Sequence, residues 1–353
     1  MLRDRLIARI RQEGPLPFDE FMRAALYDSA EGYFATGPLR SAKEGDFLTS
    51  PEVSPLFGET IACFVAAEAA RIGADPVDVL EVGAGSGSLT RPLLDAVPVP
   101  ARARAVEVSP AAQEGLAEVA PEAAVVASLD EVAGPLRGVI VANEVADNLP
   151  AALAVRRGAE WVERRVGVVA AGESLAWVEG PARAEVAAWA ERFAGPVPEG
   201  GQVEVQLAAG EWVRRLVGLL AAGSVLVFDY GDAGEGLAGR RAEGTLRTYR
   251  GHHLGPDPLL EPGATDVTMD VDFGALAAAA RKAGAGVEVL TQAAFLERWG
   301  LRDRLAALRE EELALARTDR VMERLAVRGR ITDGEALLHP RGLGDFRVLV
   351  ATK

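Results

Sequence analysis

Residues 77–90 constrain the possible folds of this chain more than any other stretch. Val77 to Val82 is a run rich in β-branched residues that carries an acid at Glu81. Three glycines follow at alternate positions: Gly83, Gly85 and Gly87. Helical spacing of apolar residues begins just after them, so the stretch predicts a strand, a tight turn and a helix. Glycines permit positive φ and close approach of a ligand, and helix-start amides favour a nucleotide-like ligand.

The spacing of these glycines separates two classes of nucleotide site. A dinucleotide-binding turn reads Gly-x-Gly-x-x-Gly or Ala, whereas here the third glycine comes one residue early and Ser88 occupies the last slot. A nicotinamide oxidoreductase is therefore disfavoured. The pattern acid-x-Gly-x-Gly-x-Gly instead resembles motif I of class I S-adenosylmethionine (SAM) methyltransferases. That resemblance implies that Glu81 and the three glycines bind SAM and release S-adenosylhomocysteine as the product.

A second acid lies one predicted strand further on. The apolar run from Ala103 contains Glu107 near its end, followed by Val108. A carboxylate in this position can accept both ribose hydroxyls through its two oxygens. The same resemblance extends the expected cofactor-binding set to the following residues: Asp46, Thr49, Glu107, Val108, Ser128, Leu129 and Asn143.

Composition narrows the class of protein and of partner. The 353 residues carry a net charge of −14, from 52 acids against 38 lysines and arginines. This balance argues against nucleic acid and favours a cationic or neutral substrate, although general solubility explains it equally well. Cys63 is the sole cysteine, which suits a reducing compartment. We expect no signal peptide, and the longest apolar stretch, residues 216–228, is shorter than the ~20 residues of a membrane span. We expect a cytoplasmic protein that binds no membrane, with a homodimer left open.

Further motifs extend the resemblance over nearly the whole chain. Residues 45–58 read Gly-Asp-Phe-x-Thr-Ser-Pro-Glu-x-Ser-x-x-Phe-Gly. Turn and helix-cap chemistry, with Ser54 as the cap, is an alternative explanation of this segment. Six later segments continue the pattern in order: 106–110, 143–150, 229–231, 245–252, 262–273 and 344–349. Together they resemble the MidA-like (DUF185) methyltransferases, the family that includes the mitochondrial complex I assembly arginine methyltransferase.

The resemblance implies an α/β fold of the class I methyltransferase type. Its Rossmann-like, mostly parallel seven-stranded sheet would carry an N-terminal helical cap and substrate-binding insertions. Alternation of apolar and polar residues over 151–180 predicts an antiparallel excursion from that core. The expected organisation is a cap and loop at 1–76, the first half of the core at 77–150, a substrate-side insert at 151–202, the second half at 203–290 with a lid or loop at 232–270, a helical insert at 291–338 and a closing strand at 339–353.

The candidate catalytic residues follow the fourth predicted strand, which ends at Asn143-Glu144. Ligands of open α/β sheets bind beyond the carboxyl ends of strands, so both side chains are expected near the transferred methyl. Turn formation by Asn143 and Asp147 is an equal alternative. Methyl transfer needs a positioned and, where necessary, deprotonated nucleophile. Glu144 is the first candidate for this work, ahead of Asn143, Asp147 and His252, and His252 has a structural role as its alternative.

The family resemblance also implies a guanidinium acceptor, which paired carboxylates can hold in a fork. Glu52, Asp266 and Tyr230 are the candidates for substrate binding. Because Val145 and Ala146 replace two bulky apolar residues usual in the family, the substrate pocket is expected to be wider or differently packed. No metal site is expected, since the three histidines lack ligand partners at short spacing.

The leading hypothesis is a SAM-dependent methyltransferase that acts on a protein or peptide side chain, with arginine nitrogen as one acceptor. An O- or N-methyltransferase of a small molecule or peptide natural product is the alternative within the same fold. A non-catalytic assembly factor that binds SAM is the alternative from another class.

Overall fold

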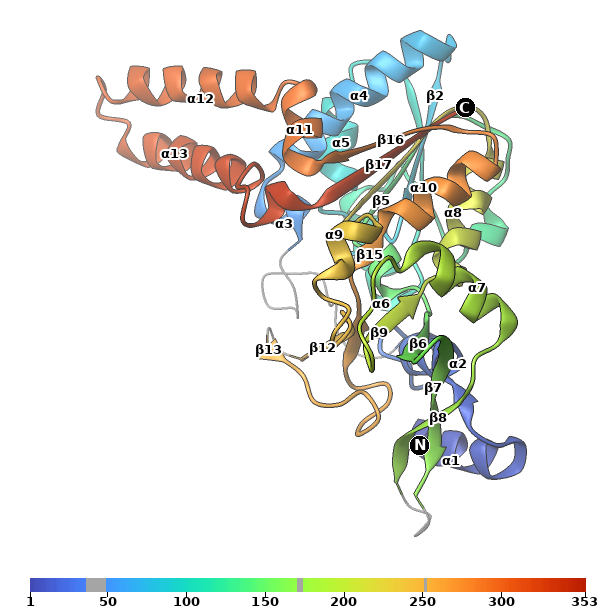
Figure 1. The fold of residues 1–353 in the computed structure, drawn as a ribbon. Coiled ribbons are helices and arrows are strands. Elements are labelled where there is room, and N and C mark those ends of the chain that lie inside the picture. The colour runs from blue at the N-terminus through green and yellow to red at the C-terminus, as the bar shows by residue number, and fades with distance from the viewer. Residues whose placement is uncertain (36–48, 170–173, 251–252) are drawn as a thin grey trace. The chain divides into compact units, whose positions relative to one another are not determined.

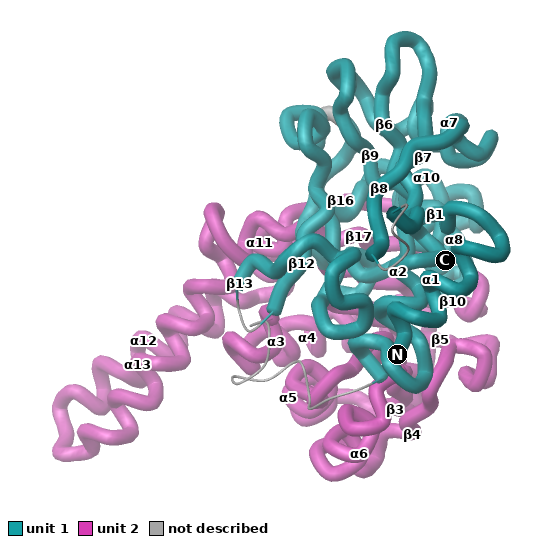
Figure 2. The backbone as a smooth tube through the Cα atoms, turned by 90° about the horizontal axis from the view of Figure 1, so that it is seen from below, with its two compact units in different colours: residues 1–40, 144–217, 229–285 teal, residues 41–143, 218–228, 286–353 magenta. Residues whose placement is uncertain are grey.

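The computed structural model describes residues 1–35, 49–169, 174–250 and 253–353. These residues form two compact units, each assembled from separated segments of the chain (Figure 2). Unit 1 takes its described residues from 1–40, 144–217 and 229–285, and unit 2 takes them from 41–143, 218–228 and 286–353.

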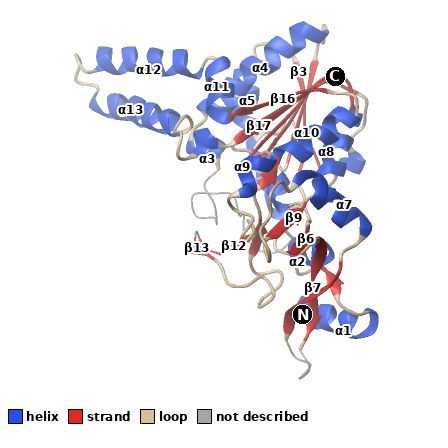
Figure 3. Cartoon of the chain, in the orientation of Figure 1, coloured by secondary structure: helices blue, strands red, loops and turns tan. Residues whose placement is uncertain are grey.

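Unit 2 contains the seven-stranded sheet, in the order β16-β17-β10-β5-β2-β3-β4 (Figures 1 and 3). Its strands are β2 (Val77–Val82), β3 (Ala101–Val106), β4 (Ala124–Val126), β5 (Leu136–Asn143), β10 (Leu220–Asp229), β16 (Gly286–Thr291) and β17 (Arg347–Thr352). The pairs from β4 through β3, β2 and β5 to β10 are parallel, and β16 runs antiparallel to β17. The predicted class I methyltransferase fold, with its mostly parallel seven-stranded sheet, is confirmed.

The central strands are apolar because side chains on both faces are buried. All six residues of β2 are buried. Alternate residues of β2 and β5, such as Val77, Val79, Val139 and Val141, share one core cluster with helix α4 (Leu56–Ile72). Helix α5 (Thr90–Ala96) follows the glycine turn and packs on α4 and β3.

The remaining helices of unit 2 are short, except for a hairpin of two long ones. The short ones are α3 (Ser50–Val53), α6 (Pro110–Val119), η1 (Leu129–Glu131), α11 (Gln292–Arg298) and η3 (Leu343–Asp345). Helices α12 (Leu301–Leu315) and α13 (Val321–Ala336) pack against each other. Their buried residues recur at helical spacing, which gives each helix one apolar stripe for the seam.

Unit 1 is built around a five-stranded antiparallel sheet. Its strands are β1 (Leu16–Pro17), β6 (Ala152–Arg157), β7 (Glu160–Val168), β8 (Leu175–Pro181) and β9 (Gln202–Val205). Helices α1 (Leu2–Glu13) and α2 (Phe18–Tyr27) share one core with the sheet, whereas α7 (Ala184–Phe193) shares a second core with β6 and β9. The predicted antiparallel excursion after residue 150 is confirmed.

The rest of unit 1 consists of short elements that bring distant segments together. They are η2 (Ala146–Asn148), α8 (Leu207–Leu219, whose last two residues belong to unit 2), β11 (Gly231–Asp232), α9 (Gly234–Ala238), β12 (Arg247–Arg250), β13 (His253–Leu254), β14 (Asp266–Thr268), β15 (Val271–Asp272) and α10 (Phe273–Lys282). Strand β14 pairs with β12, and β15 pairs with β11. No helix in the described ranges combines the length and the apolar character that a bilayer span requires.

Candidate active site

The glycine turn of unit 2 has the predicted geometry. Gly83, Gly85 and Gly87 join β2 to α5 with φ of 73°, 51° and 80°. A Cβ on Gly87 would lie 2.8 Å from Cδ1 of Leu116 on α6, so both the backbone and the packing require glycine there. The amide of Gly83 donates to the carbonyl of Val106 at 2.8 Å, which ties the turn to the end of β3.

Glu107 joins the glycine turn to the segment after β3. Its Oε2 accepts the amide proton of Gly85 at 2.8 Å, and its Oε1 accepts that of Ser109 at 2.8 Å. The side chain is buried, and burial raises the pKa of its carboxyl although these backbone hydrogen bonds act in the opposite direction. The amide of Val108 acts on the same carboxylate, whose roughly four lone-pair sites leave room for a hydroxyl donor beside the backbone amides. Val108, the next residue, is 47% exposed.

Glu81 is a second buried acid at this turn. Thr90, at the start of α5, donates a short hydrogen bond from its hydroxyl to Oε2 of Glu81. Burial raises the pKa of Glu81 to about 8, a shift that the Thr90 hydrogen bond opposes and the charge of Glu107 reinforces. Two buried carboxyl groups, Glu81 and Glu107, therefore lie at this turn, and the charge of Glu107 affects the ionisation of Glu81.

The other expected cofactor residues of unit 2 have local roles as well. Ser128 follows β4 and accepts the amide proton of Asp130 at 3.3 Å, which caps η1 beginning at Leu129. Thr49 and Glu52 form a capping box at α3, in which Oε2 of Glu52 accepts the Thr49 amide proton at 2.9 Å. Two residues expected to bind different ligands thus contact each other. Asp46 and His252 lie outside the described residues.

A second group of functional candidates lies in unit 1, directly after β5. Glu144 has φ of 52° and is the described non-glycine residue with positive φ. This left-handed conformation costs roughly 1–2 kcal/mol for an L-residue with a Cβ. Backbone strain of this kind persists only where neighbouring contacts enforce it, and it is concentrated at functional sites.

Asp229 supplies such contacts. Its Oδ2 accepts the amide protons of Ala146 at 3.0 Å and Asp147 at 3.2 Å, and its Oδ1 accepts the amide proton of Tyr230 at 2.9 Å. The side chain is fully buried. Burial first, then the charges of Asp147 and Glu144, raise its pKa well above the usual range.

Asp147 lies in the same turn and is itself buried. Its Oδ2 accepts a hydrogen bond from Oγ1 of Thr268 at 2.6 Å and a short one from the hydroxyl of Tyr230. Burial raises the pKa of Asp147, and these two hydrogen bonds oppose the shift. Burial and the nearby Asp147 also raise the pKa of the Tyr230 hydroxyl well above its usual range.

Asp266 fixes the last residue of the turn. Nδ2 of Asn148 donates to Oδ1 of Asp266 at 2.9 Å and to the carbonyl of Val267 at 3.1 Å. The hydroxyl of Tyr27 donates to the Asn148 carbonyl at 3.2 Å. Four predicted site residues of unit 1 are therefore joined around one turn: Glu144, Asp147, Tyr230 and Asp266.

Asp229 and Thr268 were not among the predicted site residues. Asp229 had a detectable signal, because it ends an apolar strand in the same way as Asn143 ends β5. Thr268 had none, because its partner Asp147 is 121 residues away in the chain.

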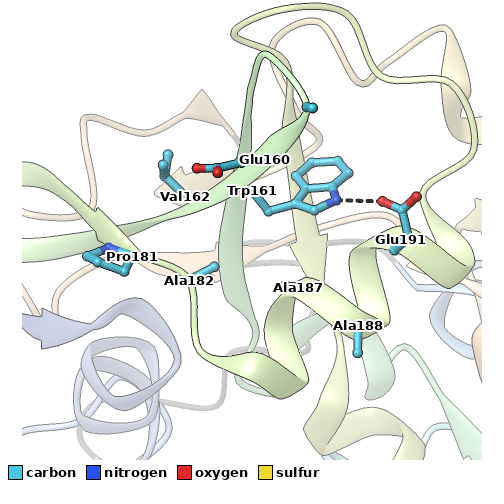
Figure 4. Close-up of a pocket in the computed structure, with 9 residues that line it drawn as sticks. Glu160, Trp161, Val162, Pro181, Ala182, Ala187, Ala188 and Glu191 are labelled. Atoms are coloured by element: carbon cyan, nitrogen blue, oxygen red, sulfur yellow. Dashed lines mark hydrogen bonds between the residues drawn. The ribbon is translucent and has the colours of Figure 1, made fainter.

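Unit 1 also has a surface groove of about 760 Å³, lined by the start of β7, the end of β8 and helix α7 (Figure 4). Its charged lining residues are Glu160 and Glu191. Glu191 accepts the indole proton of Trp161 at 3.0 Å and lies 3.6 Å from Arg156, whose guanidinium carbon is 5.0 Å from the Trp161 ring centroid. Arg156 of the chain itself therefore occupies the positions next to the Trp161 ring and the Glu191 carboxylate.

Comparison with known proteins shows the family to which the chain belongs. Residues 60–291 match the model of a family described as putative S-adenosyl-L-methionine-dependent methyltransferases. The chain belongs to this methyltransferase family. The methyltransferase is also similar over its whole length to a crystal structure from Burkholderia thailandensis, described as a likely methyl transferase bound to S-adenosyl-homocysteine. The identity is 30%, the TM-score is 0.86, and the match covers 100% of this chain and 92% of the other.

Curated relatives are similar over most of the chain. One is the protein arginine methyltransferase NDUFAF7 homolog, mitochondrial, of Drosophila melanogaster. It is 29% identical, and the match covers 77% of the present chain and 68% of the Drosophila protein. The mouse protein arginine methyltransferase NDUFAF7, mitochondrial, is also 29% identical, and the match covers 96% of the present chain and 81% of the mouse protein. The family and these similarities establish a SAM-dependent methyltransferase, so the predicted enzyme class and cofactor are confirmed.

The residues of the glycine turn fit this cofactor. A turn whose glycines leave the backbone open, beside a carboxylate with free lone pairs, has the donors and acceptors that an adenosyl ribose needs. When bound, SAM supplies an electrophilic methyl group on a sulfonium, and the protein's part is to orient the acceptor and take up a proton.

Proposed function

We propose that the methyltransferase transfers the methyl group of SAM to a side chain of a protein or peptide, with an arginine nitrogen as the acceptor. The observation that supports this most is the concentration of carboxylates around one turn of unit 1, formed by Glu144, Asp147, Asp229 and Asp266. A guanidinium is cationic and planar and must lose a proton on methylation, so a carboxylate of this group that reaches the acceptor can hold it and take its proton. The curated relatives are named protein arginine methyltransferases, which supports the same acceptor.

Within this proposal, Glu144 orients the acceptor nitrogen and accepts its proton. Its backbone begins a turn whose following residues, Ala146 to Asn148, are fixed by three hydrogen bonds to Asp229 and Asp266. Asn143, Asp147 and His252 remain further catalytic candidates. Glu52, Asp266 and Tyr230 remain candidates for substrate binding.

On the cofactor side, we propose that Glu107 accepts the ribose hydroxyls and that the three glycines admit the cofactor to the backbone. Glu81, at the end of β2, accepts the hydrogen bond of Thr90 and so ties this strand to the start of α5. The other proposed cofactor contacts are Asp46, Thr49, Val108, Ser128, Leu129 and Asn143. The reducing compartment suggested by one cysteine makes the cytoplasm our proposed location, whereas the curated relatives are named mitochondrial.

A small-molecule or peptide natural product is the second candidate acceptor. The observation that favours it is the size of Val145 and Ala146, which stand where the family resemblance implies bulkier residues. Ala146 is 1% exposed, so its small side chain is packed within the protein.

The proposal is tested by incubating the protein with methyl-labelled SAM and a cell lysate and identifying the labelled species by mass spectrometry. We expect label on arginine in one or a few peptides, and none in a parallel reaction with Glu144→Gln. A labelled metabolite would contradict the protein acceptor and favour the second candidate. Absence of any transfer would contradict both and leave a SAM-binding assembly factor.

A further inference from the structure

We propose that Asp229 is a positioning residue for methyl transfer, which acts by holding the turn from Glu144 to Asp147 in the shape that keeps Glu144 in its left-handed conformation. The inference rests on the role proposed above for Glu144. It assigns to Asp229 no contact with the acceptor.

The first argument is the set of hydrogen bonds that Asp229 accepts. One oxygen takes the amide protons of two consecutive residues, Ala146 and Asp147, and the other takes that of Tyr230. Consecutive amides point at one acceptor only when the backbone curls around it, as in an anion-binding nest. The carboxylate of Asp229 therefore defines the shape of the turn.

The second argument is the conformation of Glu144, two residues before the first of these amides. Glu144 is neither glycine, asparagine nor aspartate, so its φ of 52° is unfavourable by itself. The turn would relax if its hydrogen bonds were lost, and the Glu144 side chain would then leave from a different direction. Asp229 thus maintains a geometry that the sequence of the turn does not favour.

The third argument is that a carboxylate is costly in this place. Asp229 is fully buried, it forms no ion pair with an arginine or lysine among the described residues, and the two charged groups that raise its pKa, Asp147 and Glu144, are acids. A buried acid among other acids is unfavourable unless it has a role that a smaller polar residue cannot fill. Accepting three amide protons at once is such a role.

The turn is also held at Asp147 by the segment Thr268–Met269. The carbonyl of Asp147 accepts the amide proton of Met269 at 3.2 Å, and Asp147 Oδ2 accepts from Thr268. These contacts secure Asp147, and the hydrogen bonds of Asn148 to Asp266 and Val267 secure the next residue, whereas the amide of Ala146 depends on Asp229. Loss of Asp229 is therefore expected to release the Glu144 end of the turn first.

The test compares Asp229→Ala, Asp229→Asn and a control, Asp272→Asn. Asp272 is equally buried in unit 1 and caps α10 by accepting the Ala275 amide proton at 3.0 Å, but it is not part of the turn. Amide hydrogen exchange at Ala146 and Asp147 is followed by NMR. Turnover is followed as S-adenosylhomocysteine release with a synthetic arginine-containing peptide, or with whichever acceptor the lysate experiment identifies.

We expect Asp229→Ala to speed exchange at both amides by about tenfold or more and to lower kcat by about tenfold or more with KM changed little. Calorimetric Kd for SAM should stay within about twofold of wild type, because the cofactor candidates at the glycine turn are untouched. Asp229→Asn keeps an oxygen acceptor for the two turn amides, so it should restore most of the protection and part of kcat. Asp272→Asn should lower Tm without a selective loss of kcat.

Unchanged exchange at Ala146 and Asp147 in Asp229→Ala would overturn the proposal, as would faster exchange with wild-type kcat. An equal loss of kcat in Asp272→Asn at equal Tm would reduce Asp229 to a stability role and also overturn it. The exchange measurement requires no methyl acceptor, so failure of the arginine assignment alone would show as peptide inactivity in wild type with the exchange result intact.

Discussion

At the scale of single residues, backbone strain and buried charge meet at Glu144 and its neighbours. Glu144 adopts a conformation that its own side chain disfavours, and three buried or half-buried acids surround the turn that it begins. A residue selected for stability alone would be glycine at this φ. The retention of a carboxylate there is consistent with a role in the reaction.

Substitution of Glu144 by Gln tests that role. The amide keeps the size of the side chain but does not accept a proton, so we expect kcat to fall by about 100-fold or more. SAM affinity measured by calorimetry should be near that of wild type. Turnover within a factor of two of wild type would remove Glu144 from the mechanism.

Glu144→Gly and Glu144→Ala separate strain from chemistry at the same position. Both remove the carboxylate, but only glycine adopts the left-handed conformation without strain. The free energy of unfolding, measured with denaturant, should therefore be about 1 kcal/mol higher for the glycine variant than for the alanine variant. Both should lose turnover alike. Equal stability of the two variants would show that Glu144 has no left-handed strain in solution.

The raised pKa of Glu81 predicts the pH dependence of stability. Burial raises the folded-state pKa from the usual 4.5 to about 8, so the native state holds a proton that the unfolded state releases across this interval. The contribution of Glu81 to stability is therefore complete below pH 4.5 and is lost as pH rises towards 8, by at most about 1.4 kcal/mol per pH unit. Denaturant unfolding of Glu81→Gln against wild type should show a flatter profile over that range; parallel profiles would contradict the shift.

At the scale of elements, glycines at different places in unit 2 have different physical reasons. Gly87 lies 2.8 Å from Leu116 when given a Cβ and has φ of 80°, whereas Gly73 ends α4 at φ of 60° with nothing within 4 Å. The first position is limited by packing and conformation, the second by conformation only. This difference separates the glycine turn after β2 from an ordinary helix end.

Gly87→Ala and Gly73→Ala measure the difference. We expect Gly73→Ala to cost about 1 kcal/mol of unfolding free energy and Gly87→Ala to cost about 1–3 kcal/mol more, because the buried side chain of Leu116 must also shift. Only Gly87→Ala should weaken SAM binding. Similar costs for both variants, with unchanged SAM affinity, would show that α6 is not held against the turn.

The α12–α13 hairpin offers a matched pair on one helix. A Cβ on Gly334 would lie 2.6 Å from Cδ1 of Leu56 and 2.7 Å from Cδ2 of Leu305, whereas Gly329 on the same helix has nothing within 4 Å. Gly329→Ala should stabilise the protein by about 0.5–1 kcal/mol through helix propensity, and Gly334→Ala should destabilise it by about 1–3 kcal/mol. Thermal unfolding of both variants checks this; stabilisation by Gly334→Ala would disprove the close packing of the hairpin.

At the scale of the whole molecule, local patterns predicted the core but not the residues that complete the site. Alternating glycines after a β-branched run and the acid at Glu107 act over a few residues, and the sequence displays such local rules directly. The partnership of Asp147 with Thr268, and that of Ala146 with Asp229, depend on segments 121 and 83 residues apart. No periodicity records contacts of that range, and the positive φ of Glu144 contradicts the preference of its residue type.

Cap chemistry shows the same limit on a smaller scale. The sequence predicted Ser54 as the cap of the helix that runs to about Ile72, which is α4, but it did not predict the short helix α3 with its capping box of Thr49 and Glu52. Ser54 still accepts the amide proton of Leu56 at 3.4 Å at the start of α4. Two adjacent helix starts share one motif, and turn propensities alone do not divide such a segment between them.

The central claim is that the glycine turn and Glu107 form the SAM site of this methyltransferase. Isothermal titration of SAM into wild type, Glu107→Ala and Glu144→Gln tests it most directly. We predict saturable binding to wild type and Glu144→Gln with equal Kd, and a Kd raised by about tenfold or more for Glu107→Ala, since two hydroxyl acceptors are lost. Binding to Glu107→Ala as tight as to wild type would contradict the account.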